Sequence, residues 1–194
     1  MVHRKLAISL AALIGLAIAP PLRGDEGEQP RMVTGGRTTP PRGYFELCKE
    51  HPKVCEVQSK ATDPVSLSTE QWQEVRRINR AVNDTIQHAT DQDLYGREEV
   101  WAFPETAGDT EDFALLKQRQ LTERGIPSSS LLLTVAIKPN GDGHALLTIS
   151  TSEGDFILDD ETNEILSWGK VPYKFIKRQD PTHSARWVKI ADDN

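Results

Sequence analysis

Apolar side chains recur at intervals of three and four residues after Ser68. The stretch STEQWQEVRRINRAVNDTIQHA has one apolar stripe, made of Trp72, Val75, Ile78 or Asn79, Val82 and Ile86. Such a stripe predicts an amphipathic helix of about twenty residues that buries one face. Ser68, with Gln71 three places later, forms a capping box that fixes where this helix begins.

A second helical pattern begins in the stretch GDTEDFALLK, residues 108 to 117. Asp109 is suited to the N-cap position, and Gly125 followed by Pro127 ends a helix. We therefore predict a helix from about residue 110 to 124. Its buried face would consist of Phe113, Leu116 and Leu121.

Beyond this helix the pattern changes to short runs of apolar and β-branched residues. SLLLTVAI at 130 to 137, HALLTIS at 144 to 150 and DFILDD at 155 to 160 are separated by hairpin sequences, PNGDG and TSEGD. A further strand is expected at 173 to 178, and Trp187 and Val188 are expected to close an edge of the sheet. Two helices followed by an antiparallel meander predict an α+β domain.

The N-terminal part of the chain has a different composition. A positive start is followed by an uncharged run over residues 6–19, which predicts a secretory signal peptide within residues 1–24; a retained membrane anchor is the alternative. Residues 25–42 are rich in Gly, Pro and charge and are expected to be a disordered lead-in. Residues 43–194 would form one folded domain, periplasmic or secreted, with no membrane span in the mature protein.

Charge and cysteine content narrow the choice of function. The net charge of −6 and the absence of a long basic run argue against nucleic-acid binding. Cys48 and Cys55 lie seven residues apart, and export would favour a local disulfide between them. A metal site or a catalytic thiol are the alternatives, but no acidic cluster or helix N-terminus precedes either cysteine.

Three positions could form a catalytic group. Residue 110 opens a predicted helix, His144 opens the second predicted strand, and Asp159 ends the third. In papain-like and transglutaminase-like folds a nucleophile stands at such a helix start, a strand histidine is its base, and an Asp or Asn orients the histidine. From the residues alone, a solvent-facing hairpin histidine and an ordinary acidic turn remain the competing interpretations.

The motifs resemble those of the bacterial transglutaminase-like cysteine peptidases, which are periplasmic proteins. The shared pattern is a Trp, then GDCED and an aliphatic stretch with Lys, then HA or HM, then LDN; this chain has GDTED, HA and LDD, and the resemblance covers roughly residues 44 to 190. It implies a core in which the helix carrying the nucleophile position packs on an antiparallel sheet. His144 matches the family's catalytic histidine and Asp159 its aspartate, whereas Asp160 replaces an Asn.

The family's cysteine falls on Thr110. A hydroxyl cannot be ionised as a thiol can, and the extra methyl of threonine restricts χ1. We therefore expect peptidase activity to be weak or lost. Three functions remain open: peptide-bond hydrolysis by Thr110, His144 and Asp159; a non-catalytic protein that binds a peptide or protein; and acyl transfer to an amine.

The acidic residues around Thr110 have two interpretations. Some members of the family, including one that cleaves a biofilm adhesin, bind calcium beside the cysteine, so the resemblance implies Ca²⁺ ligands at Asp109, Glu111 and Asp112 and a protein partner such as a cell-surface adhesin. Oxygen-rich clusters suit Ca²⁺. The alternative is that Asp109 caps the helix and that the other two are first-turn acids favoured by the helix dipole.

Overall fold

A single antiparallel sheet organises the chain. The computed structural model describes residues 31–191. Within this range seven strands pair in the order β1-β9-β8-β4-β5-β6-β7. Their bounds are Thr34–Thr38 (β1), Leu131–Ile137 (β4), Gly143–Thr151 (β5), Gly154–Leu158 (β6), Leu166–Ser167 (β7), Lys174–Asp180 (β8) and His183–Ile190 (β9).

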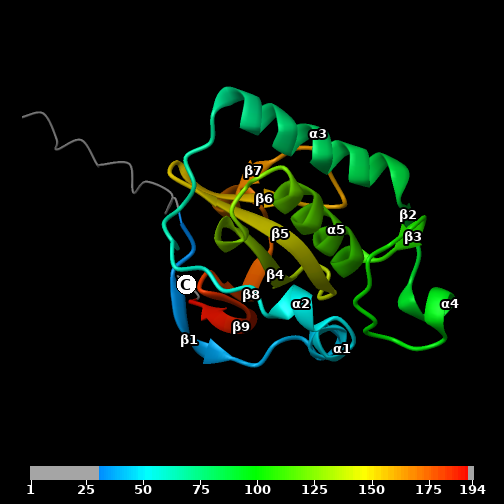
Figure 1. Ribbon diagram of the computed structural model, residues 1–194. Helices are drawn as coiled ribbons and strands as arrows, with labels where there is room; N and C mark the ends of the chain where they lie inside the picture. Colours follow the sequence, from blue (N-terminus) through cyan, green and yellow to red (C-terminus); the bar gives the residue numbers. More distant parts are fainter. Residues whose placement is uncertain (1–30, 192–194) are drawn as a thin grey trace, which may run out of the picture.

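The helices gather on one side of this sheet (Figure 1). Their bounds are Arg42–Glu50 (α1), Pro52–Cys55 (α2), Thr69–Thr85 (α3), Asp91–Tyr95 (α4) and Thr110–Glu123 (α5), with 3-10 turns at Ser128–Ser130 (η1) and Trp168–Lys170 (η2). Helix α5 packs on β4 and β5, and α3 packs on α5. A separate parallel pair joins β2 (Gln87–His88) to β3 (Ala107–Gly108), just before α5.

Both main helices were predicted from their apolar spacing. Helix α3 begins at Ser68 with the expected capping box, in which Ser68 and Gln71 exchange hydrogen bonds. Helix α5 ends at Glu123, close to the predicted end, and its last turn leads into Gly125 with φ of 85°. The α+β prediction, with a helix packed on an antiparallel sheet, is confirmed.

Apolar side chains fill both faces of the sheet. The larger cluster lies between the sheet and helices α1, α3 and α5, and includes Tyr44, Trp101 and Trp187, whose rings meet edge to face. The smaller cluster lies on the other face and includes Phe175, against which Trp168 packs. Burial on both faces explains why the strands are nearly continuous runs of apolar residues.

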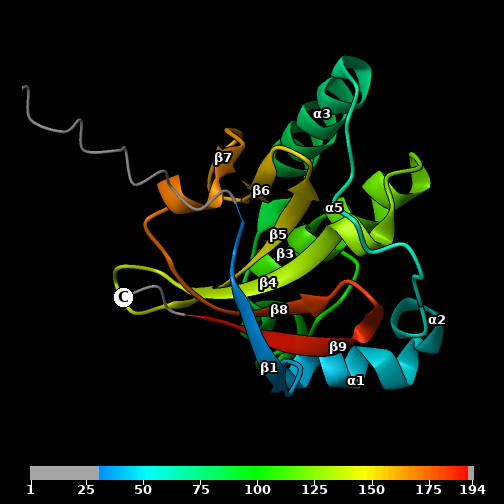
Figure 2. The same cartoon turned by 90° about the vertical axis from the view of Figure 1, so that its left-hand side faces the viewer.

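The N-terminal prediction needs correction where the structure describes it. Residues 31–42, predicted as disordered lead-in, contain β1, which pairs with β9 (Figure 2). The backbone N–H of Met32 donates to Asp155 Oδ2 at 3.0 Å, and the Arg31 side chain donates to the Thr151 carbonyl at 2.6 Å. These long-range contacts order a segment whose composition has little to bury. The predicted signal peptide, residues 1–24, lies outside the described residues.

Two further predictions can be compared with the structure. Cys48 and Cys55 form the expected disulfide, which joins α1 to α2. The expectation that Trp187 closes an edge of the sheet is wrong, because β9 lies between β8 and β1. Between residues 31 and 191, no helix is both long and apolar enough to cross a membrane.

Candidate active site

His144 and Asp159 meet at one end of the sheet. His144 begins β5 and Asp159 directly follows β6, and these two strands pair antiparallel. This pairing brings His144 Nε2 to 2.8 Å from Asp159 Oδ1. Both side chains are buried. The structure therefore brings together the predicted base and its predicted orienting carboxylate.

The Asp159 carboxylate is held from several sides. Tyr173 Oη donates to Oδ2 at 2.8 Å, and the Glu161 backbone N–H donates to Oδ1 at 3.2 Å. The Tyr173 ring also meets the His144 ring edge to face, with centroids 5.3 Å apart. These contacts fix the direction in which the carboxylate faces the imidazole.

Each member of the His144–Asp159 pair favours the charged form of the other. Burial opposes ionisation of Asp159, but the hydrogen bond and charge of His144 outweigh it and hold the pKa of Asp159 well below its usual range. Burial likewise opposes charge on His144, but Asp159 outweighs it and raises the pKa of His144. With Asp159 ionised, Nε2 carries the proton it shares with the carboxylate, and Nδ1 of a neutral ring is the basic nitrogen.

Thr110 is the first residue of α5 and faces the start of β5. Its Oγ1 accepts a hydrogen bond from the Ala145 backbone N–H at 3.0 Å and donates to Glu111 Oε2 at 3.2 Å. His144 Nδ1 is buried and has no hydrogen-bond partner within residues 31–191. The third predicted residue therefore lies beside the dyad, but its hydroxyl is bonded to other groups.

A cluster of carboxylates lies next to Thr110. Asp91, at the start of α4, offers an oxygen within 4.8 Å of oxygens of Asp109 and Glu111. Asp109 stands at the N-cap position, but its side chain makes no capping hydrogen bond, and one of its oxygens is buried without a partner. The capping interpretation of the Asp109 side chain is therefore wrong.

These carboxyl groups resist ionisation. Burial and repulsion from neighbouring carboxylates raise the pKa of Asp109 to about 7 and that of Glu111 to about 8. The same two causes raise the pKa of Asp112 to about 7. A cation held between the oxygens would remove this repulsion.

Asp112 lies outside the group formed by Asp91, Asp109 and Glu111. Its Oδ1 accepts the Ala102 backbone N–H at 2.7 Å, so it braces the loop before α5. A Cβ at Gly108 would lie 2.6 Å from Asp112 Oδ2, so only glycine fits there. Of the three predicted ligands, Asp109 and Glu111 lie with Asp91 in a group whose oxygens could hold a metal ion, and Asp112 lies outside it. Calcium binding at these residues stays a prediction.

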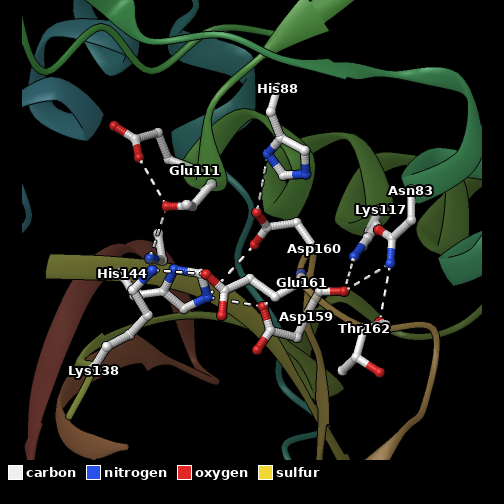
Figure 3. A network of polar contacts seen from close by, with 12 residues as sticks. Asn83, His88, Glu111, Lys117, Lys138, His144, Asp159, Asp160, Glu161 and Thr162 are labelled. Carbon is white, nitrogen blue, oxygen red and sulfur yellow. Dashed lines mark hydrogen bonds and ion pairs between the residues drawn. The ribbon is translucent and has the colours of Figure 1, made fainter. Parts of the chain in front are cut away.

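Three further groups surround the dyad (Figure 3), of which only Asp160 was singled out from the sequence. Lys117 is buried, and its Nζ donates to the Asp159 carbonyl at 2.8 Å; burial lowers its pKa to about 8. Asp160 Oδ1 lies 3.5 Å from His144 Nε2, and burial raises the pKa of Asp160 to about 6. His88 Nδ1 lies 3.5 Å from Asp160 Oδ2. Lys117 lies four residues from both Phe113 and Leu121, so its spacing along α5 fits the buried face, although a lysine is seldom buried.

An open cleft of ≈ 560 Å³ gives access to the site. Thr110 and Glu111 line it from α5, and His144 and Ala145 line it from β5. Trp101 and Val135 add apolar surface, and Arg42, Glu99 and Lys177 add charge. A cleft of mixed polarity beside a His–Asp pair suits a peptide segment.

Solved structures of Legionella pneumophila LapG have a fold similar to that of this chain. Legionella pneumophila LapG in calcium-bound form has a TM-score of 0.50 and 24% identity, over 56% of this chain and 65% of that chain. A second LapG structure has a TM-score of 0.52 and 24% identity, over 61% of this chain and 68% of that chain. An EGTA-treated form has a TM-score of 0.52 and 24% identity, over 63% and 68%. The likeness shows a shared fold.

The family is shown by the sequence. No curated protein matched the chain significantly. The family model described as bacterial transglutaminase-like cysteine proteinase, BTLCP, matches residues 34–194. The match includes the helix start at Thr110, the His144–Asp159 pair and the sheet that joins them. The chain therefore belongs to the bacterial transglutaminase-like cysteine proteinases.

Proposed function

We propose that this chain binds a peptide segment of a protein in the cleft beside His144, and that its capacity to hydrolyse the segment is weak or lost. One observation carries the proposal. The Thr110 hydroxyl occupies the nucleophile position but is held by the Ala145 N–H and by Glu111, while His144 Nδ1 has no partner within the described residues. The base and its orienting acid are thus present without an activated nucleophile.

The chemistry of threonine supports this assignment. A helix N-terminus and a histidine can stabilise a thiolate near neutral pH, but they cannot ionise a hydroxyl. A hydroxyl nucleophile needs its base within about 2.6–3.2 Å to take the proton during attack. The Thr110 hydroxyl instead donates to Glu111, which belongs to the carboxylate cluster and not to the His144–Asp159 pair.

Calcium is the cation that best suits the carboxylate cluster. Asp91, Asp109 and Glu111 supply only oxygen donors, as Ca²⁺ prefers, and buried oxygens of Asp91 and Asp109 have no hydrogen-bond partner within residues 31–191. One LapG structure with this fold is calcium-bound. We propose that these three residues hold Ca²⁺, which would supply charge that keeps the loop before α5 in place.

The compartment and partner follow from the same proposal. The Cys48–Cys55 disulfide fits an oxidising compartment, in keeping with a signal peptide and a periplasmic location. The partner would be an extended segment of a protein, for which a cell-surface adhesin is the candidate given by family resemblance. The mixed apolar and charged lining of the cleft is compatible with such a segment.

Thr110→Cys tests the proposal directly. If only the nucleophile is missing, this variant should react with a thiol-directed electrophile and hydrolyse peptides, whereas the wild-type chain should do neither. The Cys48–Cys55 disulfide leaves no other free thiol in the described chain to confuse the labelling. Adding an amine acceptor to the assay separates hydrolysis from acyl transfer.

Two controls make the result interpretable. Thr110→Ser keeps a hydroxyl and removes the methyl, so it should stay inactive if ionisation is the obstacle. Adding His144→Ala to Thr110→Cys should slow labelling by about two orders of magnitude or more, because the thiolate loses its cationic partner. An inert Thr110→Cys variant that is folded would refute the proposal that only the nucleophile is missing.

A further inference from the structure

We propose that His144, Asp159 and Asp160 form a second cation site, suited to a transition-metal ion such as Zn²⁺ and distinct from the carboxylate cluster beside Thr110. His144 Nε2 and one carboxylate oxygen each from Asp159 and Asp160 lie within 4.8 Å of one another. The proposal concerns binding and does not depend on whether the chain hydrolyses peptides.

The distances in this group suit a tetrahedral ion. Zinc bonds of about 2.0–2.2 Å to nitrogen and oxygen place two ligand atoms of a tetrahedral site about 3.4 Å apart. Asp160 Oδ1 lies 3.5 Å from His144 Nε2, close to that spacing. Asp159 Oδ1, at 2.8 Å from the same nitrogen, would move outward by about 0.6 Å as the ion replaces the shared proton.

A buried oxygen without a partner points to the same place. Asp160 is 7% exposed, and its Oδ1 has no hydrogen-bond partner within residues 31–191. A buried carboxylate oxygen normally has a donor, because burial without a partner removes its hydrogen bonds to water and returns none. Directed at His144 Nε2, this oxygen lies where a cation would satisfy it.

The surroundings provide support and access. Tyr173 Oη holds the other oxygen of Asp159 at 2.8 Å, which orients that ligand in the way metal sites require. His88, whose side chain is 57% exposed, contacts the other oxygen of Asp160 and stacks on Phe113. Figure 3 shows Asp160 between the two histidines, so rotation of His88 would open a path to the ion site.

The donor set distinguishes this site from the one beside Thr110. Imidazole with carboxylates suits Zn²⁺, whereas a set of carboxylates alone suits Ca²⁺. Lys117 places a positive charge nearby, with its Nζ on the Asp159 carbonyl, and this charge limits the affinity. An ion on His144 Nε2 would break the His144–Asp159 hydrogen bond, so zinc would hold the base in an inactive arrangement.

Calorimetric titration of the chelator-treated chain with Zn²⁺ tests the proposal. The wild type should bind one ion at this site, and excess Ca²⁺ should not displace it. Asp160→Asn keeps the shape of the side chain but removes a charged ligand, so it should weaken Zn²⁺ binding on the order of tenfold or more. Circular dichroism confirms that each variant is folded.

Matched controls locate the ion. Asp109→Asn alters the carboxylate cluster, and His51→Gln removes an exposed histidine far from the site in sequence; both should bind Zn²⁺ as the wild type does. If Asp160→Asn does not fold, His144→Gln provides the same comparison. The proposal is overturned if the variants of this site bind Zn²⁺ with wild-type affinity, or if Asp109→Asn alone abolishes binding.

Discussion

The two walls of the candidate site differ in how well their polar groups are satisfied. On the sheet side, the buried pair of His144 and Asp159 and the partly buried Tyr173 form a connected set of hydrogen bonds. On the helix side, Asp109 and Glu111 are close, partly buried and mutually repelling, and their pKa values are raised. The charges of the His144–Asp159 pair balance each other, whereas the carboxylates of the helix wall have no counter-charge within residues 31–191.

This difference indicates that the geometry of the sheet wall does not depend on which residue stands at position 110. The His144–Asp159 pair is fixed by strand pairing and by Tyr173, none of which involves residue 110. Thr110 in turn bonds to the backbone of Ala145, so it still ties α5 to β5. A change at residue 110 that keeps this hydrogen bond therefore leaves the cleft beside His144 in place.

The largest expected effect comes from changing the sheet wall. Asp159→Asn should lower the free energy of unfolding by about 2–3 kcal/mol, because an amide cannot accept from His144, Tyr173 and the Glu161 N–H together. Urea unfolding of the variant and the wild type measures the difference. Equal stability would mean that the sheet wall is not held by this carboxylate.

The pH dependence of stability should report on the helix wall. Asp109 and Glu111 have pKa values raised to about 7 and about 8, above those of the unfolded chain, so the folded state holds their protons more tightly. The stability that these two protonated groups contribute to the folded state is complete below about pH 4. It is lost as the pH rises through 7 to 8. The melting temperature of the calcium-free chain should thus fall by several degrees between about pH 5 and 8.5.

A control is needed, because His144 and Asp160 also have raised pKa values and shift stability in the same direction. Glu111→Gln should make the decline with pH shallower, and Ca²⁺ at pH 8 should restore the melting temperature in the wild type more than in this variant. A melting temperature that is independent of pH and of Ca²⁺ would contradict the proposed calcium site.

Removing the Thr110 hydroxyl should have a smaller effect. Thr110→Val keeps the shape of the side chain but leaves the Ala145 N–H without its acceptor, at a cost of about 1–2 kcal/mol. Thr110→Ser, which retains the oxygen, should stay within about 0.5 kcal/mol of the wild type. Thermal unfolding of the two variants side by side measures whether the hydroxyl has a structural role.

The smallest effect should have the opposite sign. Asp109→Asn removes one charge from the repelling cluster, so in the absence of Ca²⁺ it should stabilise the chain by about 0.5–1 kcal/mol at pH 8. The same exchange of Asp for Asn at position 159 destabilises it. Urea unfolding in the presence of a chelator compares the free energies of unfolding of the two variants. Destabilisation by Asp109→Asn would show that the carboxylates of the cluster do not repel one another.

Parts of this site were open to prediction because they depend on local pattern. The apolar stripe and capping box located α3, and the acidic stretch with its downstream glycine located α5. One hairpin between His144 and Asp159 was enough to pair them, because adjacent antiparallel strands bring such ends together. The capping role of the Asp109 side chain was predicted from residue type and was wrong, since neighbouring acids occupy the space around it.

Other parts depend on contacts that no local pattern encodes. Asp91 reaches the cluster only because the β2–β3 pair brings the α4 segment beside the start of α5. Lys117 is buried because its ammonium finds the Asp159 carbonyl, a contact across the fold. The β1 strand was missed because its glycine-rich sequence has little propensity of its own and is ordered by pairing with β9.

The sequence by itself determined the class of fold, the order of its main elements and the presence of a threonine at the start of α5, because spacing and residue type are properties of short segments. Only the tertiary structure decided that this hydroxyl bonds to Ala145 and Glu111, that Asp91 joins the acidic cluster, and that Asp160 lies between two histidines. The reason is that burial and charge repulsion depend on which distant segments the fold brings together.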